Sequence, residues 1–172
     1  MQEIEVKILE IDREAIEQKL VALGAEKVFD GELWAMFFDH PDGQIKAKGD
    51  VLRLRKEGEA CILTYKQHVS KAEAKIMEET ETVVDNMEAT MHILQKAGLQ
   101  ILKSTRKRRT SYQLADGQVV IDDYADELAP IPVFLEVESP NLEALKRVVQ
   151  ALDYTMNDCN NWNTRDLIKH YL

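Results

Sequence analysis

The sequence has few of the residues that build disulfide frameworks and zinc sites. Its only cysteines, Cys61 and Cys159, lie far apart, and its four histidines have no ligand spacing. We therefore expect a reduced setting and neither a disulfide scaffold nor a thiolate zinc centre. The chain also lacks an apolar run as long as a membrane span and a basic then apolar leader. These absences predict a cytoplasmic protein that does not contact a membrane.

Positive charge is also in short supply. The 22 Lys and Arg residues are outnumbered by 31 Asp and Glu residues, which gives a net charge of -9. An acidic surface argues against general nucleic-acid binding, because phosphate backbones attract basic proteins. One basic run, residues 103–109, is compatible with a nucleic-acid patch, but its alternation favours a strand. We therefore predict no nucleic-acid partner.

The most informative feature that is present is an alternation of charged and aliphatic residues. The segment Glu3-Ile4-Glu5-Val6-Lys7 places its three charged side chains on one face of a strand, because side chains on a strand alternate with period two. For a single strand, a solvent-exposed face is the commoner explanation of such a pattern. Several other segments repeat it, and each carries charges of mostly one sign: Leu52-Arg53-Leu54-Arg55, Glu79-Thr80-Glu81, Lys107-Arg108-Arg109 and Leu135-Glu136-Val137-Glu138.

Strands outnumber helices in the predicted order of elements. Turn signals separate the strand candidates, and Asp116-Gly117 is the strongest hairpin signal among them. This order predicts an α+β protein with an antiparallel sheet, and no linker divides residues 1–172 into two domains. Helices are predicted after Asp12, after Asp85, over residues 141–152 and after Trp162. The strand candidates start at Glu3 and then cover residues 33–38, 51–56, 60–66, 77–84, 107–114, 119–124 and 133–138.

The charged faces fit the inside of a closed barrel with helices around it. Such a lumen needs nearly equal numbers of acids and bases, because unpaired buried charges are very costly. Arg and Lys suit phosphate oxygens, while clustered carboxylates suit a hard divalent cation such as Mg²⁺ or Mn²⁺. The charged face carries seven acids and six bases: Glu3, Glu5, Glu79, Glu81, Asp122, Glu136 and Glu138, and Lys7, Arg53, Arg55, Lys66, Lys107 and Arg109.

The ordered set of segments resembles a known family. The opening Glu3-x-Glu5-x-Lys7 is similar to the signature of the CYTH superfamily, the triphosphate tunnel metalloenzymes. This superfamily includes class IV adenylyl cyclases, thiamine triphosphatases and inorganic triphosphatases. The later segments resemble the family motifs in their usual order: Leu52-Arg53-Leu54-Arg55, Leu63-Thr64-Tyr65-Lys66, Glu79/Glu81, Lys107/Arg109, Ile121-Asp122 and Phe134 to Glu138.

The resemblance implies a closed antiparallel tunnel that binds a small-molecule triphosphate together with Mg²⁺ or Mn²⁺. It implies the six bases named above as phosphate contacts and the seven acids as metal ligands or groups that orient water. Within these sets, Lys66, Glu5 and Glu81 are the implied catalytic residues. The protein is expected to be a monomer or a homodimer.

Two chemistries fit such a tunnel. In hydrolysis a water attacks the terminal phosphorus of tripolyphosphate, a nucleoside triphosphate or thiamine triphosphate. In cyclisation the ribose hydroxyl of ATP attacks the α-phosphorus, and cyclic AMP and pyrophosphate form. We favour the metal-dependent triphosphatase, because the sequence shows no clear nucleoside pocket. Adenylate cyclase is the alternative, and a polyphosphate-binding module without turnover is the second alternative.

Overall fold

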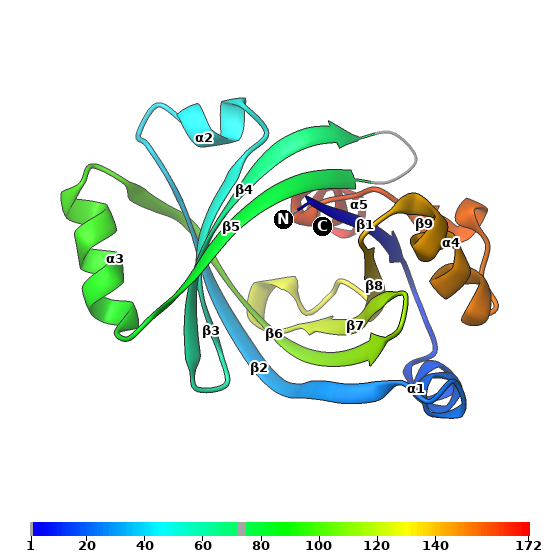
Figure 1. Cartoon of the computed structure of the whole chain (residues 1–172). Coiled ribbons are helices and arrows are strands. Elements are labelled where there is room, and N and C mark those ends of the chain that lie inside the picture. Colours follow the sequence, from blue (N-terminus) through cyan, green and yellow to red (C-terminus); the bar gives the residue numbers. More distant parts are fainter. Residues whose placement is uncertain (1, 72–74) are drawn as a thin grey trace.

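In the computed structural model the chain folds into a closed antiparallel β-barrel with helices around it (Figure 1). The structure describes residues 2–71 and 75–172, apart from the side chains of residues 2, 3, 70, 71 and 75. The predicted fold class is thus confirmed. The barrel strands are β1 (Gln2–Ile8), β2 (Glu26–Asp39), β3 (Val51–Glu57), β4 (Ala60–Lys71), β5 (Lys75–Val84), β6 (Gln100–Leu114), β7 (Gly117–Tyr124) and β8 (Phe134–Ser139).

The first strand closes the barrel. The strand order is β5-β4-β3-β2-β6-β7-β8-β1, and β1 pairs with β5 as well as with β8. In this closing contact Ile4 lies opposite Ile76, and on the other side of β1 Lys7 lies opposite Glu136. A short ninth strand, β9 (Cys159–Asn160), pairs antiparallel with the C-terminal end of β1. Closure leaves few exposed strand edges.

Apolar side chains face outward, as the alternation predicts. Val6 is 1 % exposed and lies in the largest apolar core, which also contains Leu20 and Leu145 from two helices. The core therefore lies between the outer surface of the barrel and the helices, and the charged faces are left for the lumen. This arrangement is the inverse of a small barrel with an apolar interior.

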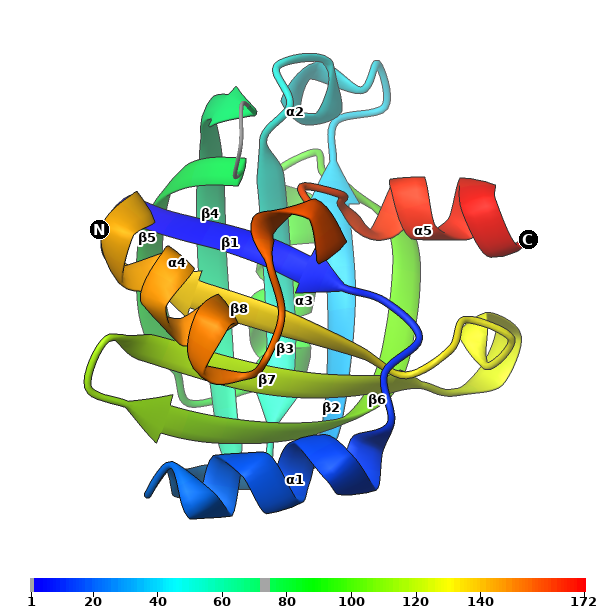
Figure 2. The same ribbon diagram turned by 90° about the vertical axis from the view of Figure 1, so that its right-hand side faces the viewer.

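Two of the covering helices pack on this core (Figure 2). Helix α1 (Arg13–Ala22) starts where the Asp12 side chain accepts a hydrogen bond from the Ala15 backbone N–H. Its buried residues are Ile16 and Leu20, whereas Leu23, just after the helix end, is 38 % exposed. Helix α4 (Leu142–Ala151) covers the strands at the other side of the core.

The other helices close different sides of the barrel. Helix α3 (Met87–Lys96) packs Met87, Met91 and Leu94 near β2 and β3. Its cap is Asn86 rather than the predicted Asp85, because the Asn86 side chain reaches the Ala89 N–H at 2.9 Å. Helix α5 (Thr164–Tyr171), predicted after Trp162, docks through a fully buried Leu167.

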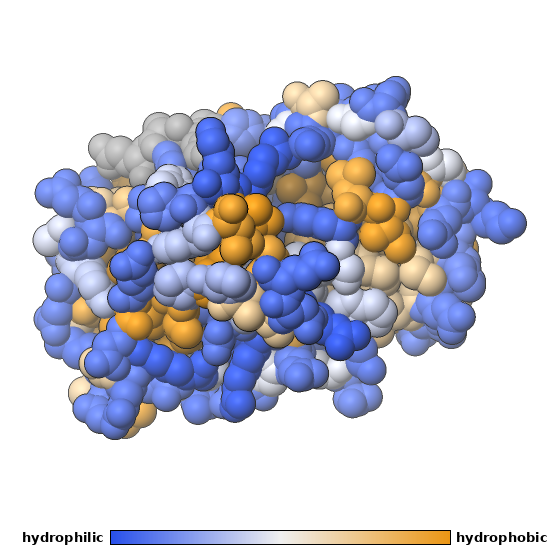
Figure 3. Space-filling view, turned by 180° about the vertical axis from the view of Figure 1, so that it is seen from behind, coloured by the Kyte–Doolittle hydropathy of each residue, from blue (hydrophilic) through white to orange (hydrophobic). Residues whose placement is uncertain are grey.

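Two differences from the predicted elements concern the long strands and one short helix. Strands β2 and β6 are much longer than their predictions, because the unpredicted half of each strand pairs with the predicted half of the other. A short helix, α2 (Gln44–Ala47), was not predicted; Asp39 holds it by accepting hydrogen bonds from the backbone N–H groups of Ile45 and Lys46. Within residues 2–71 and 75–172, no helix is long and apolar enough to span a membrane. From behind, apolar patches lie among mostly hydrophilic side chains (Figure 3).

Candidate functional site: a charged tunnel

A cavity of about 660 Å³ lies inside the barrel, and all eight barrel strands contribute to its lining. The six predicted phosphate-binding cations all line it, and five of the predicted acids do so too. Asp122 is fully buried behind this lining, and the side chain of Glu3 lies outside the described residues. The charged lining consists of Lys7, Arg53, Arg55, Lys66, Lys107 and Arg109, with Glu5, Glu57, Glu79, Glu81, Glu136 and Glu138.

One wall of the tunnel is a network of paired charges. Arg109 Nη2 lies 2.6 Å from Asp122 and 2.7 Å from Glu136, whose other oxygen lies 2.9 Å from Lys7 Nζ. Lys107 also pairs with Asp122. Burial would raise the pKa of Glu136, but Lys7, Lys107 and Arg109 hold it well below its usual value. Every charged group of this wall therefore has an oppositely charged partner within it.

Next to that wall, three carboxylates crowd together. Glu5 and Glu138 face each other directly across β1 and β8. Burial raises the pKa of Glu138, and the charges of Glu136 and Glu5 raise it further. A bound divalent cation would relieve this repulsion, so the donor set fits a hard metal. In the described part of the chain, however, no three acid, histidine or cysteine side chains already converge as a metal cage.

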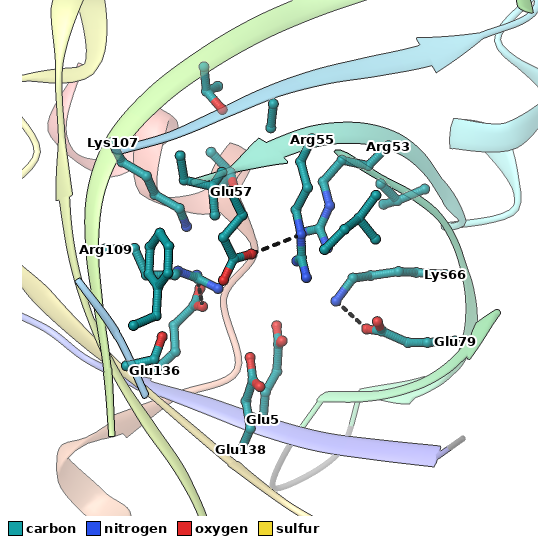
Figure 4. A pocket seen from close by; sticks show the side chains of 18 of the residues that line it. Glu5, Arg53, Arg55, Glu57, Lys66, Glu79, Lys107, Arg109, Glu136 and Glu138 are labelled. Carbon is teal, nitrogen blue, oxygen red and sulfur yellow. Dashed lines mark hydrogen bonds and ion pairs between the residues drawn. The ribbon is translucent and has the colours of Figure 1, made fainter. Parts of the chain in front are cut away.

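The opposite wall carries two arginines with different surroundings (Figure 4). Arg55 pairs with Glu57 at 3.2 Å and with Glu81 at 3.5 Å, and Glu81 also accepts a hydrogen bond from the Thr64 hydroxyl. Arg53 has two buried nitrogens, Nε and Nη2, without a hydrogen-bond partner among the described residues. Burial lowers the pKa of Arg53 to about 10, and Arg55 and Arg109 add to this effect. The charges of Glu79 and Glu136 offset part of this lowering, but no carboxylate among the described residues bonds to these two nitrogens.

Beside the arginines, Lys66 and Glu79 form an ion pair across β4 and β5. Their side chains are 12 % and 14 % exposed, so this pair is part of the enclosed lining rather than of the outer surface. Register explains the placement, because Lys66 lies opposite Val51 on one side and Glu79 on the other. The catalytic residues implied by the resemblance, Lys66, Glu5 and Glu81, therefore all reach the same cavity.

Sequence reasoning missed some of the lining. Glu57 continues the alternation of Arg53 and Arg55, so extending the third strand by one residue reveals it. Asn163 and Thr164 reach the tunnel from the start of α5. No sequence pattern indicates these two, because their position depends on how the terminal helix docks.

Comparisons with known proteins agree with this geometry. The model of the CYTH domain family matches residues 1–158. A Methanocaldococcus jannaschii protein named "putative adenylate cyclase" is 27% identical over 138 residues, which are 80% of this chain and 77% of that protein.

Solved structures share the fold. The PH1012 protein from Pyrococcus horikoshii has a TM-score of 0.80 at 22% identity, and the match covers 96% of this chain and 98% of that one. The Hippeastrum protein HpAC1, described as a "putative adenylyl cyclase" that reveals a dominant triphosphatase activity, has a TM-score of 0.71 at 16% identity, covering 98% and 95%. At these identities the structures establish the fold, and the family match extends over most of the chain. The chain therefore belongs to the CYTH domain family.

Proposed function

We propose that the protein is a metal-dependent triphosphatase that cleaves a triphosphate inside the tunnel. The observation that carries this proposal is Arg53, whose guanidinium is buried beside two other arginines and whose Nε and Nη2 atoms have no hydrogen-bond partner in the described part of the chain. A buried cation without an anion is costly, and a bound phosphate removes that cost. Arginine also suits phosphate oxygens through paired hydrogen bonds.

The remaining cations extend the anion site along the tunnel. Lys66, Lys107 and Arg55 line the same cavity and would bind the other phosphate oxygens. Asp122, which pairs with Lys107 and Arg109, would hold those two side chains in place rather than bind metal. This division of roles assigns the fully buried acid to positioning and the tunnel-lining acids to the reaction.

The carboxylates opposite the arginines are assigned to the metal and the water. Glu5, Glu136 and Glu138, with Glu3, would hold Mg²⁺ or Mn²⁺. Such a cation supplies charge neutralisation at the phosphate oxygens when bound. Glu81 is fixed by Thr64 and Arg55 and would orient the attacking water and accept its proton. Arg53 and Lys66 would stabilise the charge that develops on the oxygens of the transferred phosphoryl group.

A second candidate is adenylate cyclase, because the Methanocaldococcus jannaschii relative carries that name. Both reactions use the same charged lining, and they differ in the phosphorus that is attacked. One assay separates them: purified protein is incubated with tripolyphosphate, ATP or thiamine triphosphate under Mg²⁺ or Mn²⁺, and orthophosphate and cyclic AMP are measured separately. Orthophosphate release supports the triphosphatase. Cyclic AMP without orthophosphate, or tight binding without any product, contradicts it.

A further inference from the structure

The two ends of the tunnel differ in chemistry. Near the β3–β4 turn the inner wall is apolar, and this region is called here the apolar end. Leu33 lies opposite Lys107 on one side and Glu57 on the other, and Ile62 lies opposite Arg55. The apolar end therefore borders the cations directly. Its residues are Val28, Phe29, Leu33, Ala60 and Ile62.

A β-bulge in β2 lies at the apolar end. Lys27 pairs with Tyr112 and Phe29 pairs with Ser111, so Val28 is an extra residue in β2. Lys27 lies over the Tyr112 ring, 5.5 Å from its centroid, and Tyr112 belongs to the outer core. Phe29 follows the bulge and shares the inner face of Leu33 by alternation, and the extra residue Val28 also lines the cavity.

Two glycines leave room for the Phe29 ring. A Cβ atom at Gly31 would lie 3.2 Å from the ring, and one at Gly58, in the β3–β4 turn, would lie 3.7 Å from it. The first distance is tighter than ordinary contact, so a larger residue at Gly31 would displace the ring. The absence of a side chain at Gly31 and at Gly58 therefore leaves the space that the Phe29 ring occupies.

The opposite end is cationic. Phe37 also lines the cavity, but the Lys103 ammonium lies over its ring, 4.7 Å from the centroid. Burial lowers the pKa of Lys103, and Arg165 and Lys46 lower it further, which places three cations near one another there. Arg53 lies opposite Phe37 on the inner face. A triphosphate has its greatest charge at its free end, which fits this cationic end.

Glu57 gives the apolar end one polar group. It lies opposite Leu33 and Ala60, and its Oε2 atom makes no hydrogen bond within the described residues, although it lies 3.2 Å from Arg55 Nε. A carboxylate beside an aromatic ring can accept a hydrogen bond from the amino group of a stacked heterocycle.

We propose that the substrate is an organic triphosphate whose planar, amino-bearing heteroaromatic ring binds at the apolar end, stacked on Phe29 with its amino group donating to Glu57. Inorganic tripolyphosphate, which has no such ring, leaves this end unused. The inference rests on the proposed triphosphatase function. It assigns the orientation of the substrate, with the ring near the β3–β4 turn and the free phosphate toward Arg53.

The test compares kcat/KM for ATP and for tripolyphosphate in four proteins: wild type, Phe29→Ala, Phe29→Leu and Ile93→Ala. Ile93 is 67 % exposed on α3, away from the cavity, so the Ile93→Ala variant serves as the matched control. Wild type and control are expected to prefer ATP equally. Phe29→Ala should lower the ratio of ATP to tripolyphosphate about tenfold, the usual size of an aromatic stacking loss. Phe29→Leu, which keeps an apolar side chain, should lower it about threefold.

A second substrate pair tests the amino group. The wild type should prefer ATP to the triphosphate of purine riboside, which lacks the amino group, about tenfold. Glu57→Met should remove this preference. The substitution also takes an ion-pair partner from Arg55, and because tripolyphosphate has no ring, its turnover measures that second effect alone. An unchanged ratio in both Phe29 variants, with wild-type thermal melting, overturns the inference.

The inference can fail separately from the proposed function. If the wild type releases no orthophosphate from any triphosphate, the triphosphatase proposal fails. Titration calorimetry then tests the ring site by measuring the affinities for the β,γ-imido analogue of ATP and for tripolyphosphate. A tenfold fall in the affinity ratio in Phe29→Ala supports the site, and an unchanged ratio refutes it.

Discussion

Replacing Arg53 with methionine is expected to stabilise the protein without ligand and to weaken triphosphate binding. Burial and the charges of Arg55 and Arg109 lower the pKa of this guanidinium on folding to about 10, well below its usual value. That difference corresponds to about 3 kcal/mol. A cation whose pKa is depressed destabilises the folded state in full below about pH 10, and the penalty disappears as the pH rises toward the unfolded value. Methionine keeps the apolar stem and removes the charge.

Thermal denaturation at pH 7 measures both effects. For a chain of this length, about 3 kcal/mol corresponds to a rise in Tm of roughly 6 to 12 °C. Tripolyphosphate at a hundred times its Kd should stabilise the wild type by about 2.7 kcal/mol, and the same concentration should stabilise Arg53→Met much less. The control is Arg106→Met: Arg106 lies over the Trp34 ring, 5.6 Å from the centroid, on the exposed outer face.

The control is expected to change neither the Tm nor the ligand shift by much, because exposed charges contribute little. A lower Tm in Arg53→Met, together with a ligand shift equal to that of the wild type, would refute the reasoning. That result would mean that Arg53 is stabilised by the protein itself and does not bind the anion.

Other substitutions test the network and the framework. Glu136→Gln should abolish turnover and also cost about 3 kcal/mol of stability in urea denaturation, because Lys7 and Arg109 lose a buried partner; unchanged turnover would remove Glu136 from the site. Burial would raise the pKa of Asp39, but the backbone N–H groups of Lys46, Ile45 and His40 lower it. Asp39→Asn should therefore cost about 1 to 2 kcal/mol at pH 7, and this difference should shrink as the pH falls through the folded pKa, below 3.8; a pH-independent difference would contradict this cause. Tyr171→Phe removes the 2.9 Å hydrogen bond to Glu10 and should cost about 1 kcal/mol, measured in the same way; no loss would mean that this bond does not anchor α5.

The inner face of the barrel could be predicted because alternation is a local property. Arg53 and Arg55, or Glu136 and Glu138, share a face wherever their strand lies, and the sorting of charges by strand made a solvent face the less favoured explanation. The near balance of acids and bases was compatible with a closed lumen, and the resemblance to the CYTH superfamily implied the closure. The predicted end of the third strand at Lys56, one residue short, was enough to hide Glu57.

Other features could not be predicted, because they depend on contacts distant in sequence. Phe29 shares the inner face of Leu33 but lies before the predicted start of that strand, and the extra residue Val28 shows only in the pairing of β2 with β6. The lack of a hydrogen-bond partner for Arg53 among the described residues likewise depends on which acids the opposite strands supply. Thr164 reaches the tunnel only through the docking of α5.

A crystal structure with tripolyphosphate and Mn²⁺ tests the central claim most directly, because the anomalous signal of Mn²⁺ locates the metal separately from the phosphates. The account predicts phosphate oxygens within hydrogen-bond distance of Arg53 Nε and Nη2 and a metal beside Glu5 and Glu138. A tunnel that stays empty at saturating tripolyphosphate, or an anion bound only on the outer surface, would contradict it.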